Sequence, residues 1–344
     1  MSRTVLVTGV ARDLGRRFAR QIAASPEVSR VIGVDVQPPR GDLGTVQFVR
    51  ADIRNPVIAK VIVREQVDTV VHMSVLGDGE ASGRTSAKEL NVIGTMQLLA
   101  GCQQAPDLRH LVVKSSTAVY GASNRDPAMF SEDMGAKRQL RSGFGKDVTE
   151  VESYVRGFAR RRPDVRVTTL RTAPAIGAGV HTSLTAYFRL PVVPTVLGFD
   201  ARLQFLHETD VLDVLEHAVR EEVAGTFNVA GDGIVMLSQA VRRLGRPAIP
   251  VPGFALSQFG SVVRPTRLAA LAPERVAFLT FGRGVDTTRM RDVLGFRPSY
   301  TSAEAFAGFA RALGPGPLSA ERVQRSESAV AHALGVSGGG GADG

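Results

Sequence analysis

The chain has 344 residues, of which 44% are hydrophobic and 22% are charged. This length is sufficient for one large core or two smaller ones, and the composition is that of a globular protein. The lone Cys102 excludes an internal disulfide and fits a reducing cytoplasm. The apolar run that follows Met1 is too short for a secretory leader or a membrane span, so we expect a cytoplasmic protein without membrane attachment.

The formal net charge of +9 raises the possibility of nucleic-acid binding. The basic residues, however, are nearly all arginines that are scattered along the chain. The densest run, residues 160–162, falls at the expected end of a helix, where cations complement the helix dipole. We therefore interpret the basic residues as solvated surface, and nucleic-acid binding remains a distant alternative.

Short apolar strands alternate with helices along the first half of the chain. This alternation predicts right-handed crossovers and a doubly wound α/β fold of the Rossmann type, with a parallel sheet and ligands at the carboxyl ends of its strands. Strands are expected at residues 4–8, 30–36, 46–49, 69–74, 111–115, 166–170 and 225–229. Helices are expected at residues 14–24, 57–65, 88–104, 147–161 and 209–222.

The regular alternation ends where proline and glycine become frequent. We expect residues 1–172 to form a nucleotide-binding domain of the Rossmann type, to which 201–230 return. Residues 173–200 and 231–313 are expected to form a smaller, mixed C-terminal lobe. Residues 314–344 lack the apolar content needed to fold, so we predict a largely disordered tail.

A glycine turn, Thr8-Gly9-Val10-Ala11-Arg12-Asp13-Leu14-Gly15, follows the first strand and opens the first helix. Backbone N–H groups and the helix N-terminus at such a turn can cradle a pyrophosphate. Asp35 ends the second strand, where a carboxylate accepts hydrogen bonds from ribose hydroxyls and repels a 2′-phosphate. The pattern predicts a dinucleotide site that prefers NAD to NADP.

Further segments follow in a characteristic order. Ala51-Asp52-Ile53-Arg54 ends the third strand, Val71-His72-Met73-Ser74 ends the fourth, and Asn91-Val92-Ile93-Gly94-Thr95 lies in the next helix. Residues 111–121 then read LVVKSSTAVYG. Over about residues 4–310 the chain resembles the extended short-chain dehydrogenase/reductases, the NAD-dependent epimerases and dehydratases such as UDP-glucose 4-epimerase. The resemblance implies NAD bound to the first domain, a nucleotide-activated sugar as substrate bound by the C-terminal lobe, and a homodimer.

The glycine turn departs from the family motif. The middle glycine is replaced by Arg12 or Asp13, depending on the register, and a carboxylate there would repel a pyrophosphate. Arg12 can pair with phosphate instead, or with the 2′-phosphate of NADP. The alternative is a Rossmann-like domain that no longer holds dinucleotide. The resemblance assigns cofactor contacts to Thr8, Gly9, Arg12, Leu14, Gly15, Asp35, Asp52, Ile53, Met73, Ser74, Asn91 and Ser115.

The catalytic pattern is incomplete. Ser116 occupies the position of the family's catalytic Ser or Thr, whose hydroxyl bonds the reacting sugar oxygen. The family also carries a Tyr and, four residues later, a Lys that lowers its pKa. With Glu152 setting the register, Phe144 and Val148 stand at these two positions, and neither can move a proton.

An alternative register keeps Lys146 but puts Ser142 at the position of the Tyr, where a hydroxyl is a far poorer acid or base. Lys146 and Asp147 are therefore the candidate replacements for the missing proton-transfer groups. The competing interpretation is a solvated helix start with Asp147 near the N-cap.

The expected substrate contacts are also altered. Residues 170–179 resemble the segment after the sixth strand of the family, but Pro174 replaces its substrate-contacting Asn and has no amide to offer. Residues 204–210 resemble a segment that contacts nucleotide-sugar, which implies contacts from Gln204 and His207. No metal-binding pattern is found, and no metal is expected.

Two hypotheses follow. The first is an NAD-dependent epimerase or dehydratase that acts on a nucleotide-activated sugar by transient hydride transfer. The second is a catalytically silent relative that binds dinucleotide or nucleotide-sugar and has a regulatory or partner-binding role. Loss of general acid–base help typically lowers a rate by about 10²–10⁴, so the two hypotheses predict very different turnover.

Overall fold

The computed structural model describes residues 3–75, 87–140, 142–253 and 272–316. Seven parallel strands form one sheet in the order β11-β6-β5-β4-β1-β2-β3, which confirms the doubly wound α/β prediction. The strands are β1 (Arg3–Thr8), β2 (Val28–Asp35), β3 (Gln47–Arg50), β4 (Thr69–His72), β5 (His110–Ser116), β6 (Arg166–Thr172) and β11 (Gly225–Val229).

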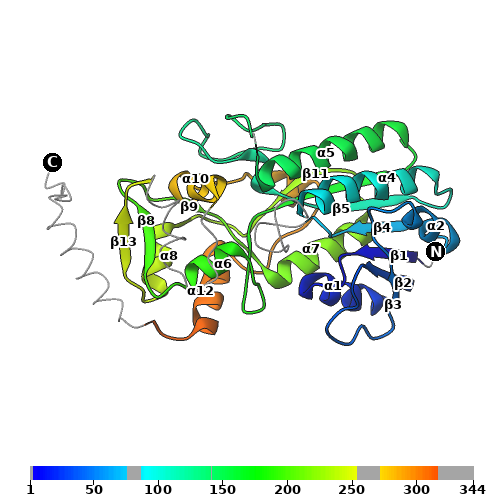
Figure 1. Ribbon diagram of the computed structural model, residues 1–344, viewed down its shortest axis with the longest axis horizontal. Helices are drawn as coiled ribbons and strands as arrows, with labels where there is room; N and C mark the ends of the chain where they lie inside the picture. The colour runs from blue at the N-terminus through cyan, green and yellow to red at the C-terminus, as the bar shows by residue number, and fades with distance from the viewer. Residues whose placement is uncertain (1–2, 76–86, 141, 254–271, 317–344) are drawn as a thin grey trace, which may run out of the picture.

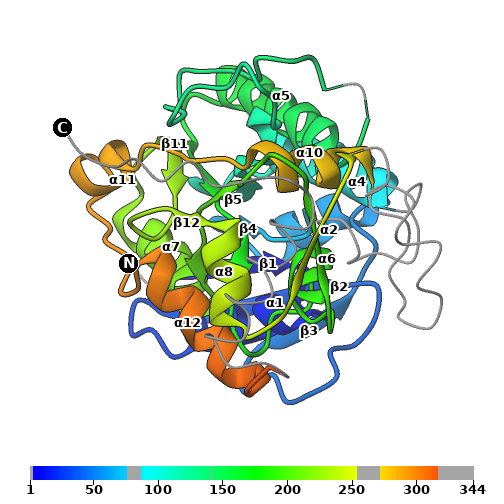
Figure 2. The same cartoon turned by 90° about the vertical axis from the view of Figure 1, so that its left-hand side faces the viewer.

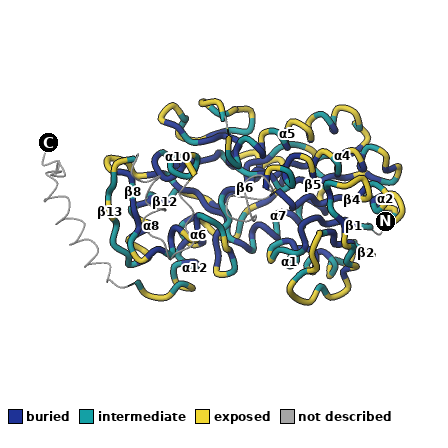
Figure 3. Tube along the Cα trace, viewed as in Figure 1, coloured by how far each residue is buried: buried dark blue, intermediate teal, exposed yellow. Residues whose placement is uncertain are grey.

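Helices cover both faces of this sheet (Figure 1). On one face, α2 (Val57–Arg64) contacts α4 (Gly94–Gln104), which in turn contacts α5 (Phe144–Arg161). On the other face, α1 (Asp13–Ala23) packs against α7 (Glu208–Glu221). The central strands are buried and the exposed residues lie on the outer helices and loops (Figure 3), as expected for a parallel sheet covered on both sides.

A second lobe lies beyond the carboxyl end of the sheet and has its own cluster of buried hydrophobic residues. In this lobe α8 and α12 lie side by side (Figure 2). Paired short strands, β7–β10, β9–β12 and β8–β13, connect its parts. Its helices are α6 (Ser183–Phe188), α8 (Leu237–Arg243), α10 (Pro273–Phe281) and α12 (Ser302–Leu313), and a further helix, α11 (Thr288–Asp292), contacts β11 of the large sheet. The short strands are β7 (Ala175–Ile176), β8 (Val193–Val196), β9 (Arg202–Leu203), β10 (Leu206–His207), β12 (Val235–Met236) and β13 (Ala248–Val251).

Several of the predicted element boundaries are wrong by one to three residues. The fourth strand, for example, ends at His72 rather than Ser74. The helix expected from 88 contains a π-helical segment, η1 (Glu89–Ile93), before α4 begins. Helix α5 begins at Phe144, three residues before the predicted start, because Gly143 with φ +90° stands at its N-cap.

Most of the predicted disordered tail lies outside the described residues. Of this tail, only residues 314–316 are described, and 317–344 are not.

The boundaries proposed for the two domains stay predictions. None of the helices in the described part of the chain is both long and apolar enough to cross a bilayer.

Candidate functional site

One cavity lies at the carboxyl ends of the central strands, between the sheet and the second lobe. Its volume is about 450 Å³, within the usual range for small-molecule sites. The ends of β1, β4, β5 and β6 contribute one wall, and α6 and α10 of the second lobe contribute the other. The lining includes Gly9, Arg12, Asp13, Leu14, Gly15, Met73, Lys114, Ser116, Phe144, Pro174, His181, Glu274, Arg275 and Arg283.

The glycine turn between β1 and α1 is closely packed. Gly9 has φ +84°, a left-handed conformation that favours glycine. A Cβ atom on Gly15 would stand 2.2 Å from the carbonyl oxygen of Gly9, so no side chain fits there. The turn therefore brings backbone to the cavity at two positions, which is the arrangement that lets N–H groups approach a pyrophosphate.

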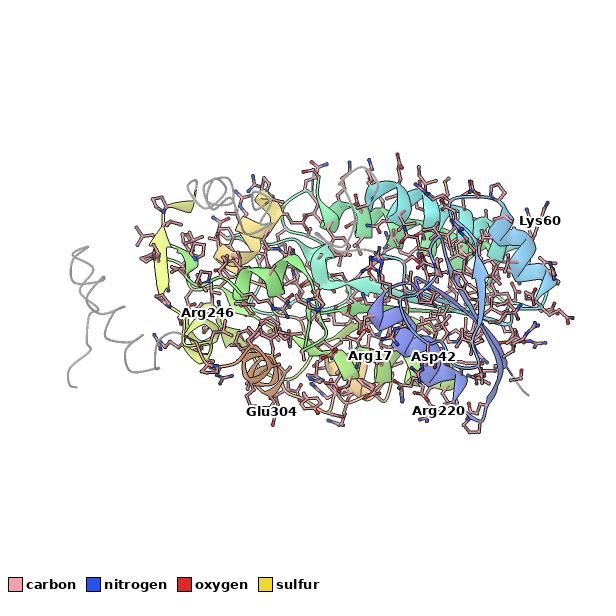
Figure 4. All side chains as sticks on the ribbon, turned by 60° about the horizontal axis from the view of Figure 1, so that its bottom comes forward. Arg17, Asp42, Lys60, Arg220, Arg246 and Glu304 are labelled. Atoms are coloured by element: carbon pink, nitrogen blue, oxygen red, sulfur yellow. The ribbon has the colours of Figure 1, made fainter. Side chains whose placement is uncertain are left out.

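The negative charge that precedes Gly15 is offset by neighbouring arginines. Asp13 accepts a hydrogen bond from Arg16 at 2.8 Å and lies 3.5 Å from Arg17, one turn further along α1. Arg17 also forms an ion pair with Glu208 at the start of α7, and its position on α1 is visible in Figure 4. These cations therefore offset part of the negative charge of Asp13 beside Arg12.

Asp35 lies against the same turn. Its carboxylate accepts hydrogen bonds from the backbone N–H of Ala11 at 3.0 Å and of Val36 at 2.8 Å. The carboxylate therefore holds the glycine turn to the end of β2. It does not line the cavity, although each of its oxygens has a further lone pair.

A chain of hydrogen bonds lies beneath the glycine turn. The N–H of Met73 donates to Oγ1 of Thr8 (3.1 Å), whose hydroxyl lies 2.9 Å from Nδ1 of His72. Nε2 of His72 lies 2.8 Å from Oγ1 of Thr95, and that hydroxyl donates to the Asn91 carbonyl. All the bonds are satisfied if Nε2 carries the proton. Burial lowers the pKa of His72 to about 4, so this core histidine is neutral.

The two serines at the end of β5 face opposite ways. Ser115 is buried, and its hydroxyl donates to Glu152 of α5 at 2.6 Å. Ser116 lines the cavity, and its Oγ accepts a hydrogen bond from the N–H of Ala118 at 3.2 Å. Because successive residues of a strand point to opposite faces, only Ser116 is available to a ligand.

An ionic network lies beneath the end of β5. Glu152 forms a buried ion pair with Arg171 of β6 at 2.7 Å. Arg171 also donates to the hydroxyl of Tyr120 at 2.7 Å, and that hydroxyl donates to Oδ1 of Asn228 at 2.7 Å. Burial raises the pKa of Tyr120, which therefore stays protonated and structural.

The first turn of α5 presents an apolar group to the cavity. Phe144 lines the cavity, and Val148 is fully buried in the main core. Lys146 is 39% exposed and pairs with Glu150 at 3.6 Å, whereas Asp147 is buried. Neither Lys146 nor Asp147 is among the residues that line the cavity.

The second lobe contributes charged groups. Arg275 donates to the hydroxyl of Ser183 at 2.6 Å, and Arg283 donates to the carbonyl oxygen of Gly121 at 2.6 Å. Burial lowers the pKa of Arg283 to about 10, so the side chain is still a cation at neutral pH. Glu274 accepts a hydrogen bond from the N–H of Gly145 at 2.8 Å and so joins the second lobe to the start of α5.

Comparison with known proteins gives a consistent result. Residues 5–230 match the NAD dependent epimerase/dehydratase family. The chain belongs to this family. An uncharacterized protein of Mycobacterium tuberculosis is 49% identical over 321 residues, which cover 92% of this chain and 85% of the relative. A dTDP-4-dehydro-6-deoxy-D-allose reductase of Streptomyces is 26% identical over 322 residues, which cover 86% of this chain and 92% of the reductase.

Solved structures share the fold of this family member. dTDP-glucose 4,6-dehydratase from Bacillus anthracis, in complex with NAD, is similar with a TM-score of 0.68 and 18% identity, over 90% of this chain and 96% of the dehydratase. MoeE5 in complex with UDP-glucuronic acid and NAD is similar with a TM-score of 0.66 and 22% identity, over 94% of this chain and 99% of MoeE5.

Only some of the predicted site residues line the cavity of this epimerase/dehydratase family member. Ser74 packs against Gly9, and Asn91 is buried at the start of the helical segment that leads into α4. Asp52 pairs with Arg54 at 2.7 Å, which lowers its pKa, and Ile53 packs against Gly94. The residues predicted from the sequence that line the cavity are Gly9, Arg12, Leu14, Gly15, Met73, Ser116 and Pro174.

The predicted substrate contacts lie elsewhere in the fold. Gln204 is buried and bonds the N–H of Val285 at 2.8 Å and the carbonyl of Gly231 at 3.2 Å. His207 caps α7 through Thr209 and stacks on Tyr300 with ring centroids 4.1 Å apart. Neither residue lines the cavity, so their substrate roles stay predictions.

Four charged residues that line the cavity were not predicted from the sequence: Lys114, Glu274, Arg275 and Arg283. The last three carry no motif and lie far along the chain from the glycine turn. Lys114 did carry a signal, because it is a charged residue inside an otherwise apolar strand. Among the described residues, no group of three or more His, Cys, Asp or Glu side chains is arranged to hold a metal ion.

Proposed function

We propose that the protein binds NAD at the glycine turn and a nucleotide-activated sugar in the adjoining part of the cavity, and that it interconverts a sugar hydroxyl and a ketone. One observation carries this proposal. A single cavity joins the glycine turn, the hydroxyl of Ser116 and the arginines of the second lobe. A dinucleotide and an anionic sugar derivative bound there would meet beside Ser116.

The glycine turn fits a dinucleotide. The close approach of Gly15 to Gly9 leaves backbone at the surface where a pyrophosphate would lie, and Arg12 adds a positive charge. The carboxylate of Asp35 beside the turn disfavours a 2′-phosphate, so we propose NAD rather than NADP. When bound, the nicotinamide supplies a hydride acceptor and donor.

The second lobe fits an anionic substrate. Arg275 and Arg283 both line the cavity, and guanidinium groups suit the phosphates of a nucleotide-sugar. The related structures with UDP-glucuronic acid and the related dTDP-sugar reductase point to the same substrate class. Ser116 would then orient the reacting sugar oxygen through its hydroxyl.

A second candidate function is a catalytically silent relative that binds the same ligands. The observation that favours it is the apolar start of α5, where Phe144 lines the cavity and Val148 is part of the core. Neither side chain can exchange a proton with a sugar hydroxyl. The two functions share ligand binding and differ only in turnover.

Thermal-shift titration tests the shared part of both candidates. NAD at about 100 times its Kd should raise the free energy of unfolding by about 2.7 kcal/mol. Gly15→Ala places a methyl group against the Gly9 carbonyl and should abolish this shift. Gly135→Ala is the matched control, because no atom lies within 4 Å of the added Cβ. Absence of a shift with NAD, NADP, UDP-glucose and dTDP-glucose would remove both candidates.

Turnover separates the two candidates. The wild-type protein, incubated with NAD and UDP-glucose, UDP-glucuronic acid or dTDP-glucose, is assayed for a new sugar product by mass and for exchange of deuterium from solvent. Product formation contradicts the silent relative. Binding of both ligands with neither product nor exchange contradicts the enzyme.

A further inference from the structure

Lys114 occupies an unusual place in the fold. Strand β5 lies between β4 and β6 in the middle of the seven-stranded sheet, and residues 110–113 before Lys114 are buried. A charged side chain in such a strand costs free energy unless it reaches water or a partner. Lys114 stands near the carboxyl end of the strand, where parallel sheets bind their ligands, and it lines the cavity.

Lys114 and Ser116 share one face of β5. Successive strand residues alternate between faces, and the intervening Ser115 bonds Glu152 of α5 on the opposite face. Residues two apart on one face are separated by about 6.8 Å, which the four-carbon side chain of a lysine can span. Both residues line the same cavity, together with Phe144 and Met73.

We propose that Lys114 is a catalytic residue that exchanges a proton with the sugar oxygen held by Ser116. It would thus supply the function that Phe144 and Val148 lack. In the oxidation direction the O–H bond would break, its proton would pass to the Nζ lone pair of Lys114, and the oxygen electron pair would form the C=O bond. A bound nicotinamide would accept the hydride from that carbon, which balances the oxidation. In the reverse direction the Lys114 ammonium protonates the carbonyl oxygen. This proposal rests on the proposed function.

Two other ionisable groups near the site are placed differently from Lys114. Lys146 pairs with Glu150 and does not line the cavity. Glu274 lines the cavity from α10, where one of its oxygens accepts the N–H of Gly145, and so lies opposite the strand that carries Ser116. Among the charged side chains that line the cavity, Lys114 is the one that lies on the same strand face as Ser116.

Two substitutions at Lys114 test the role. Lys114→Met removes the amine. Lys114→Arg keeps a positive charge, but the guanidinium group does not give up its proton. Both should lower kcat on the nucleotide-sugar by at least about 10²-fold, the usual contribution of a general acid or base. NAD affinity, measured by thermal shift, should change by less than about threefold. Lys60→Met is the matched control, because Lys60 lies exposed on α2 at the far end of the sheet (Figure 4).

Chemical labelling gives a readout that does not depend on turnover. The wild-type protein is acylated with an amine-reactive ester, and the labelled peptides are quantified by mass spectrometry. NAD together with UDP-glucose should protect Lys114 by at least about fivefold, whereas Lys60 should be labelled equally with and without ligands. Loss of the protection in the presence of both bound ligands would overturn the proposal.

The outcomes distinguish this proposal from the proposed function. Absence of NAD and nucleotide-sugar binding in the wild type defeats the proposed function itself. If Lys114→Met still binds both ligands and turns the substrate over, only the role of Lys114 is overturned. The same follows if turnover is lost in Lys146→Met but not in Lys114→Met. Turnover restored in Lys114→Arg overturns proton exchange. Binding without any wild-type turnover overturns the catalytic role in favour of the silent relative.

Discussion

The two halves of the cavity rest on different buried polar systems. Beneath the glycine turn, Thr8, His72 and Thr95 form a chain of neutral groups. Beneath the end of β5, Glu152 and Arg171 form a buried ion pair that also holds Ser115 and Tyr120. The first system supports backbone that would bind a cofactor. The second supports the strand that carries Ser116 and Lys114.

This difference shows which substitutions each half can accept. A site built from backbone N–H groups keeps its shape when Arg12 or Asp13 stands in place of the middle glycine, provided that Gly9 and Gly15 remain. A site that works through side chains depends on which residue stands at each position, and here Phe144 stands at the cavity wall. The ion pair should lose its contribution to stability when one partner is substituted, and the neutral chain should lose its contribution when the pH falls.

The largest effect is expected in the ionic system. Arg171→Met leaves Glu152 buried without its main partner and should lower the free energy of unfolding by about 3–5 kcal/mol, measured by urea denaturation. Arg156→Met is the control. Arg156 also pairs with Glu152, at 3.5 Å, but its side chain is 59% exposed, so the loss should be under about 1 kcal/mol. Equal losses in the two variants would contradict the comparison.

The neutral system should respond to pH. Burial lowers the pKa of His72 from 6.5 to about 4, so the unfolded chain binds the proton more readily than the folded one. Stability from this residue is present above pH 6.5 and is lost as the pH falls toward 4. At about 1.4 kcal/mol per pH unit, the loss amounts to roughly 3 kcal/mol.

The difference between wild type and His72→Gln isolates this contribution, because carboxylates titrate in both proteins. Urea denaturation at pH 7 and at pH 4.5 should show a smaller acid-induced loss in the variant. Burial lowers the pKa of His110 to about 4 as well, so a residual loss of the same sign should remain. The same acid-induced loss in both proteins would show that His72 does not carry the effect.

The smallest effect concerns the contact between the two parts of the molecule. Glu274→Gln keeps an acceptor for the N–H of Gly145 but removes the charge at the helix N-terminus, so the free energy of unfolding should fall by about 0.5–1 kcal/mol. Glu150→Gln, within α5, should cost less than about 0.5 kcal/mol. A larger loss in Glu150→Gln would reverse the ranking.

Most of the fold could be predicted because its signals are local. The apolar runs that became β1, β4 and β5 are short, bounded by breakers and spaced by helical patterns, so their order alone specifies a parallel sheet. The errors fall where a single residue decides a boundary. Gly143 starts α5 three residues before its amphipathic pattern would suggest.

The candidate site was only partly predictable. Gly9, Gly15 and Ser116 follow strands directly, so the strand order places them together. Arg275 and Arg283 line the same cavity because α10 and the segment after it pack against the sheet. No local sequence pattern predicts that contact. Sequence resemblance likewise did not show that Gln204 has its polar groups bonded within the second lobe.

The hydrogen bond from Gly145 to Glu274 has a consequence for the order of folding. The two residues are separated by 129 positions in the chain, so this contact closes a long loop. A contact of such sequence separation forms late, after local helices and neighbouring strands. The first turn of α5, which carries Phe144 at the cavity wall, should therefore be completed only when α10 docks, and the amide of Gly145 should exchange with solvent until then.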